Sequence, residues 1–164
     1  MCTTEVEMLR VPGASLHYRK RGSGPLLIIL QGGDGDAGGS NGIADHLADY
    51  YMVVTYDRRG LSHSKIDNSA ENLRLETHTD DVHYLLAALT AEPVFVFGAS
   101  LGALMGLDLA ARFPEQVRTL VAHEPPATQL LPDAERTRAI KDQEEVEETF
   151  RREGIAAAMQ RLSQ

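Results

Sequence analysis

The segment Gly-Ala-Ser-Leu-Gly at residues 98–102 constrains the fold more than any other part of this chain. An apolar run, residues 93–97, comes directly before it, and residues 103–113 have a helix-like composition. A serine between two glycines at such a junction is typical of a strained turn that lifts the hydroxyl above a sheet edge. The glycines leave room for the strand and the helix to approach each other. We therefore predict a strand, a sharp turn and a helix, with Ser100 as a candidate nucleophile.

Composition limits the class of partner. The 164 residues are 43% hydrophobic, which is enough for one core. A net charge of −8 argues against nucleic acid and anionic membrane as partners. No stretch approaches the 18 apolar residues of a membrane span, and the N-terminus lacks the pattern of a signal peptide. We expect a cytoplasmic protein that binds a small soluble substrate or a protein, and the single cysteine, Cys2, excludes an intrachain disulfide.

Strand-like and helix-like stretches alternate along the chain. Two short alternating runs, separated by Pro12-Gly13, predict an antiparallel hairpin over residues 5–19. Further strands are predicted at 26–30, 51–56, 93–97 and 117–122, and helices at 43–50, 75–89 and 103–113. This alternation specifies an α/β fold, a mostly parallel sheet with helices on both faces. Ligands of such sheets bind beyond the carboxyl ends of the strands.

The composition changes after Pro125-Pro126. Residues 133–164 hold eight carboxylates and six basic side chains, and they predict two helices, 134–152 and 154–163. In the second helix Ile155, Ala158, Met159 and Leu162 form one apolar face. We expect another surface to cover this face.

Three segments, residues 26–33, 56–64 and 97–103, resemble the α/β-hydrolase family in their order and spacing. The resemblance implies that Ser100 is the nucleophile and that the main-chain N–H of Leu101 is one oxyanion donor. It implies a second N–H donor in the glycine-rich loop, with Gly32 the first choice and Gly33 the next. It also implies an incomplete six-strand core over residues 1–130 and the beginning of a helical cap, or lid, over residues 131–164.

A serine hydroxyl needs an adjacent base, and the family places an acid and then a histidine after the serine. His123 alone among the six histidines follows Ser100, and we expect it at the end of a strand as a stand-in base. Some family members carry the acid where Glu124 lies; Glu124 is therefore an orienting acid or a polar strand end that caps the next loop.

The other five histidines have simpler interpretations. We expect His17 to lie in the hairpin, distant from the active edge, and His63 to follow the fourth strand, where it could line the pocket. For the three histidines on predicted helices we expect solvent-facing or core roles: His46, His78 and His83.

The remaining polar residues of the loops predict structural roles. The resemblance implies that Asp57 and Arg58 hold neighbouring backbone. Asp34 and Asp36 are better explained as turn-forming than as metal ligands, and no phosphate-binding glycine motif is present. We therefore expect neither a metal ion nor a cofactor.

Two functions stay open from the sequence. The first is a serine hydrolase of an ester, amide or related acyl bond, whose missing histidine and strands come from further sequence or another chain. The second is a truncated, non-catalytic relative that binds a small molecule or a protein. With either function, we expect homodimerisation or a complementing C-terminal segment to cover the open sheet edge and the cap helix.

Overall fold

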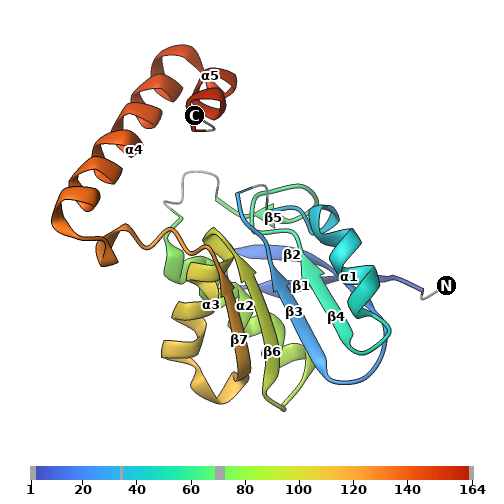
Figure 1. Ribbon diagram of the computed structural model, residues 1–164. Helices are drawn as coiled ribbons and strands as arrows, with labels where there is room; N and C mark the ends of the chain where they lie inside the picture. Colours follow the sequence, from blue (N-terminus) through green and yellow to red (C-terminus); the bar gives the residue numbers. More distant parts are fainter. Residues whose placement is uncertain (1–2, 34, 69–72, 163–164) are drawn as a thin grey trace. The chain divides into compact units, whose positions relative to one another are not determined.

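The computed structural model describes residues 3–33, 35–68 and 73–162, and the chain divides into two compact units, Met1–Pro126 and Ala127–Gln164. The first unit is a mixed sheet with helices on both faces (Figure 1). The second consists of a short 3-10 turn, Thr128–Leu130, and two helices, α4 (Asp133–Glu153) and α5 (Ile155–Leu162). No helix in the described ranges is both long and apolar enough to cross a bilayer.

The sheet has the order β1-β2-β4-β3-β6-β7, with β5 paired to β2. The β1–β2 hairpin and the β2–β4 pair are antiparallel, whereas β4, β3, β6 and β7 run parallel to one another. The predicted fold class is therefore confirmed. Its strands are β1 (Glu5–Val11), β2 (Ala14–Arg21), β3 (Leu26–Leu30), β4 (Met52–Tyr56), β5 (Lys65–Ile66), β6 (Val94–Ala99) and β7 (Val117–His123).

Helices α2 (Leu75–Leu89) and α3 (Leu101–Arg112) cover one face of the sheet, and α1 (Asn41–Leu47) covers the other. The residues of β3 are all buried, as expected for a strand covered on both faces. Alternate residues of β3 join different cores: Ile28 packs with α2 and α3, and Ile29 packs with α1. The helices thus fix the central strands, whose carboxyl ends carry the candidate site.

One predicted helix differs from the structure in its bounds, and one strand of the structure was not predicted. The first helix was predicted at 43–50, but α1 ends at Leu47, where the N–H groups of Tyr50 and Tyr51 turn back to the Leu47 carbonyl. A 3-10 turn, Ala37–Ser40, precedes α1. The two-residue strand β5 was not predicted, because only its pairing with Ala14 and Ser15 makes it a strand.

The burial of His78 on α2 predicts that the stability of the fold depends on pH. Burial, together with repulsion from Arg58 and Arg59, lowers the pKa of His78 to about 4. An unfolded histidine titrates at about pH 6.5, so between these values the unfolded chain binds the proton that the folded chain excludes. We expect the urea midpoint to fall as pH drops from about 6.5 to about 4, and to fall less in His78→Phe.

The control for this experiment is His46→Phe, at an exposed position on α1. Its midpoint should depend on pH as the wild type does. Equal pH dependence in wild type and His78→Phe would show that His78 is not the responsible group.

Candidate active site

Ser100 forms the turn between β6 and α3, in a strained backbone conformation. Its φ is 52° and its ψ is −119°, a region that residues other than glycine rarely adopt. Such strain costs about 1–3 kcal/mol and persists only where the surroundings over-determine it. The residue is exposed, so its hydroxyl is accessible to a ligand from solvent.

Gly98 and Gly102 allow the close packing on which this turn depends. A Cβ on Gly98 would lie 2.4 Å from the Gly102 carbonyl oxygen. A Cβ on Gly102 would lie 2.0 Å from the Leu30 carbonyl oxygen, which is much shorter than a van der Waals contact between the two atoms. The two glycines therefore bring the first turn of α3 against β6 and the end of β3.

The first turn of α3 and the glycine-rich loop after β3 both lie next to Ser100. Leu101 is the first residue of α3, so its N–H has no partner within the helix. The Ser100 carbonyl accepts the N–H groups of Ala103 and Leu104. On the other side Gly32 follows β3, and a Cβ placed on it would lie 3.3 Å from Ser100 Cβ and 3.9 Å from Ser100 Oγ. The loop thus approaches the serine at Gly32. A Cβ on Gly33 would have no neighbour within 4 Å among the described residues.

Arg58 holds this glycine-rich loop by its carbonyl oxygens. Its Nη1 donates to the Gly32 oxygen at 2.7 Å and its Nη2 to the Gly33 oxygen at 2.8 Å. The side chain is almost completely buried, which restricts its motion. Arg58 therefore fixes the orientation of the peptide groups beside Ser100, in keeping with the structural role that the sequence suggested.

Asp57 connects the loop after β4 to the neighbouring segments. The residue is fully buried and accepts main-chain N–H bonds from Ala37 at 2.8 Å and from His63 at 3.0 Å. Its carbonyl oxygen accepts the Ser64 hydroxyl at 2.6 Å. These contacts agree with a structural role for Asp57.

Asp36 has the turn-forming role that the sequence favoured. Its carboxylate caps the 3-10 turn by accepting the Gly38 N–H at 2.5 Å, and it accepts the Ser62 hydroxyl at 2.5 Å. The Ser62 bond, followed by the Gly38 bond, lowers the pKa of Asp36. Asp34 lies outside the described residues.

The backbone of His123 hydrogen-bonds Ser100, but its imidazole forms no hydrogen bond with the Ser100 hydroxyl. The Ser100 N–H donates to the His123 carbonyl oxygen at 2.9 Å, since β6 and β7 pair in parallel there. The side chains of His123 and Glu124 are 60% and 83% exposed, and their Nδ1 and Oε2 atoms are 3.8 Å apart. Across residues 3–33, 35–68 and 73–162, Ser100 Oγ has no hydrogen bond to a histidine.

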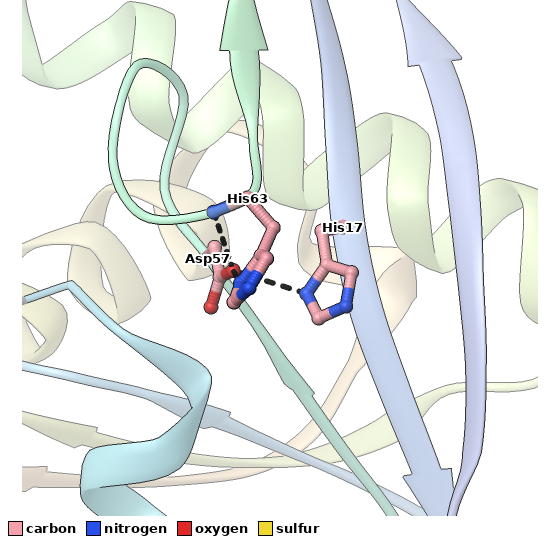
Figure 2. A group of neighbouring side chains, drawn as sticks. All are labelled: His17, Asp57 and His63. Carbon is pink, nitrogen blue, oxygen red and sulfur yellow. Dashed lines mark hydrogen bonds and ion pairs between the residues drawn. The ribbon is translucent and has the colours of Figure 1, made fainter.

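The expectation that His17 lies distant from the active edge is wrong. Strand β2 runs antiparallel to β4 with Tyr18 opposite Tyr56, which brings His17 beside Asp57 at the carboxyl end of β4 (Figure 2). Strand β2 is still three strand positions from β6, roughly 14 Å across the sheet. His17 therefore belongs to this edge without reaching Ser100.

The histidines on helices have core or solvent-facing surroundings. The ring of His83 stacks on Phe113 with 3.9 Å between centroids, and its Nδ1 lies 3.0 Å from Gln116 Oε1. His46 is exposed on α1 and His78 is partly buried on α2. None of these three histidines forms a hydrogen bond with the Ser100 hydroxyl.

A family model of the α/β-hydrolase fold matches residues 25–164, most of the chain. The chain belongs to the α/β-hydrolase fold family. This membership agrees with the sheet order, the strained serine turn and the glycine-rich loop.

Similar proteins support the same assignment over part of their length. The chain is 50% identical over 147 residues to the uncharacterized hydrolase YraK of Bacillus subtilis, covering 90% of this chain and 54% of YraK. It is 29% identical over 108 residues to the 2-(acetamidomethylene)succinate hydrolase of Mesorhizobium japonicum, covering 66% of this chain and 38% of that hydrolase. A solved hydrolase structure from Pseudomonas aeruginosa has a TM-score of 0.71 at 26% identity, covering 88% of this chain and 52% of that one. The chain therefore spans about half, or less, of the length of these relatives.

Proposed function

We propose that this α/β-hydrolase is a serine hydrolase that cleaves an ester, amide or related acyl bond. The observation that carries the proposal is Ser100 itself: an exposed serine in a strained turn, with the N–H of Leu101 beside it and Gly32 against it. Main-chain N–H groups fixed around a developing oxyanion lower the barrier to acyl transfer. The N–H groups of Gly32 and Leu101 are the proposed oxyanion donors. The N–H of Gly33 is the alternative to that of Gly32.

The reaction would proceed through an acyl-enzyme. Ser100 Oγ forms a bond to the acyl carbon as a base takes its proton, and the carbonyl oxygen becomes the oxyanion. Collapse breaks the bond to the alcohol or amine, which leaves with that proton. Water then attacks the acyl carbon as the base takes one of its protons, and the bond to Ser100 Oγ breaks as that oxygen receives the proton and the carboxylic acid leaves. The name of the Mesorhizobium relative, a hydrolase of an acetamido compound, supports acyl chemistry of this type.

We further propose that the principal base is a histidine outside these 164 residues. Support comes from two facts: no imidazole in the described ranges hydrogen-bonds Ser100 Oγ, and the chain corresponds to 54% of YraK. Glu124, at the carboxyl end of β7, is the candidate orienting acid, and His123 is the candidate stand-in base.

The complementing segment would pair with the edge of the sheet. Strand β7 ends the strand order with β6 on one side, and its Val121 side chain is 53% exposed. In the second unit the α5 side chains Ile155, Met159 and Leu162 are each more than half exposed. Both surfaces are apolar enough to need cover, from further chain or from a second copy.

A second candidate, a non-catalytic binding module for a small molecule or a protein, is favoured by the same lack of an imidazole at Ser100 Oγ in the described residues. Labelling with a fluorophosphonate probe separates the two functions. In the full-length protein, peptide mass spectrometry should find the phosphonate on Ser100, and Ser23→Ala, at an exposed serine in a loop, should label equally well. Failure of Ser100 to react in the full-length protein would leave the binding module as the better description.

Substitution of Arg58 should weaken catalysis through the loop that it holds. Arg58→Lys keeps the positive charge but cannot form both bonds to the Gly32 and Gly33 carbonyls. We expect kcat for an acyl substrate to fall by about 10- to 100-fold with little change in KM, since misplacement of an oxyanion donor affects mainly the transition state.

Arg10→Lys, at an exposed position of β1, is the matched control and should retain full kcat. Thermal unfolding of both variants distinguishes a local effect from loss of the fold. Wild-type kcat in a folded Arg58→Lys protein would contradict the positioning role.

A further inference from the structure

His17, Asp57 and His63 form a compact cluster that the proposed hydrolysis does not use. His17 comes from β2, whereas Asp57 and His63 both lie in the loop between β4 and β5 (Figure 2). Asp57 Oδ2 lies 3.0 Å from His17 Nδ1 and 3.0 Å from His63 Nδ1. One potential ligand atom from each residue lies within 4.8 Å of the others. Two imidazoles thus converge on a single carboxylate oxygen.

One nitrogen of the cluster has no hydrogen bond. The His17 side chain is only 9% exposed, and its Nδ1 has no hydrogen-bond partner within the described part of the chain. Its contact with Asp57 Oδ2 is short enough for an ion pair but is not a hydrogen bond. A buried polar atom normally has a partner, so this nitrogen requires an explanation. A cation between the nitrogen and the carboxylate would supply it.

The donor set and the two distances between carboxylate and imidazole fit a transition-metal ion. Imidazole nitrogen and carboxylate oxygen are ligands of Zn²⁺ and similar divalent ions, with bonds of about 2.0–2.2 Å. Two such ligands on one ion lie about 3.0–3.5 Å apart for bond angles between octahedral and tetrahedral. The two distances of 3.0 Å from Asp57 Oδ2 match the lower end of this range.

The surroundings orient the carboxylate and leave an entry path. Asp57 is fixed by the Ala37 N–H on Oδ1 and the His63 N–H on Oδ2, the kind of second contact that holds metal ligands in place. The His63 side chain is 65% exposed, so the cluster is reachable from solvent. The Asp36 carboxylate interacts electrostatically with His63 and adds negative charge nearby.

We propose that His17, Asp57 and His63 bind one divalent transition-metal ion of the Zn²⁺ class. The ion would join β2 to the loop after β4, next to Arg58, and leave at least one coordination position to solvent. The proposal replaces the expectation of a metal-free protein. It is independent of the hydrolase proposal, because metal binding and thermal stability can be measured without any substrate.

The test titrates the chelator-treated full-length protein with ZnCl₂ in a calorimeter and follows thermal unfolding. We expect one Zn²⁺ per chain and a Tm increase of roughly 5 to 10 °C when free Zn²⁺ is about a hundredfold above Kd. His63→Ala should weaken binding by on the order of 100-fold or more and remove the Tm increase. His63 is exposed, so this variant should fold normally.

His46→Ala is the matched control, an exposed histidine outside the cluster, and should bind Zn²⁺ as the wild type does. Absence of stoichiometric Zn²⁺ binding by the wild type would overturn the proposal. Unchanged affinity in His63→Ala, or an equal loss in His46→Ala, would overturn it as well, since the ion would then bind elsewhere.

Discussion

Replacement of Ser100 by alanine should remove hydrolysis of acyl substrates almost completely. The only nucleophile at the strained turn between β6 and α3 is the Ser100 hydroxyl, and no covalent acyl-enzyme can form without it. Loss of a serine nucleophile in such an enzyme costs on the order of 10⁶ in kcat. We expect this loss in the full-length protein with a p-nitrophenyl ester, measured by release of nitrophenolate.

The control is again Ser23→Ala, which should retain wild-type kcat. The alanine variant at position 100 should keep the wild-type Tm or exceed it slightly, because methyl and hydroxymethyl groups occupy the same exposed place. Turnover by Ser100→Ala within tenfold of wild type would place the nucleophile elsewhere and refute the proposed mechanism.

Gly102→Ala should be strongly destabilising, although alanine is the better helix former. Helix propensity alone would favour alanine by about 1 kcal/mol in α3. The new Cβ, however, would lie 2.0 Å from the Leu30 carbonyl oxygen and 2.8 Å from that of Gln31, both backbone atoms. Helix α3 must then move away from β3. We expect a loss of more than about 4 kcal/mol in the free energy of unfolding, a large share of a typical total.

Gly42→Ala isolates the propensity effect from the steric one. Gly42 is also helical, in α1, and a Cβ there would meet nothing within 4 Å in the described structure. In urea unfolding, the free energy of unfolding of Gly42→Ala should equal that of the wild type or exceed it by about 0.5–1 kcal/mol. Similar stabilities for the two alanine variants would mean that the contact between α3 and β3 is looser than these distances indicate.

Local periodicity predicted the elements that depend on their own residues. The apolar spacing in residues 75–89 matches helix α2 at both ends, and the unbroken apolar run at 26–30 matches the fully buried β3. Gly98 and Gly102 also marked the turn at Ser100 correctly, because each glycine stands where a Cβ would collide with backbone. These signals are local, so the sequence carries them.

Pairing between distant segments was harder to predict. The strand β5 has two residues and no periodicity of its own, and His17 was assigned to a position away from the active edge. Both errors have one cause: the registers of β2 with β4 and of β2 with β5 join residues some 30 to 50 positions apart in the chain. No short sequence pattern reports such a register.

The sequence by itself determined the α/β class, the strained turn and the identity of the candidate nucleophile. These follow from side-chain period and from glycine at positions where only glycine fits. Tertiary structure decided which groups surround that serine and which do not. It placed Gly32 against Ser100 and hydrogen-bonded Arg58 to the carbonyls of the loop. Within the described residues it formed no hydrogen bond between Ser100 Oγ and a histidine. It also gathered His17, Asp57 and His63, because antiparallel pairing of β2 with β4 joins residues that are remote in sequence.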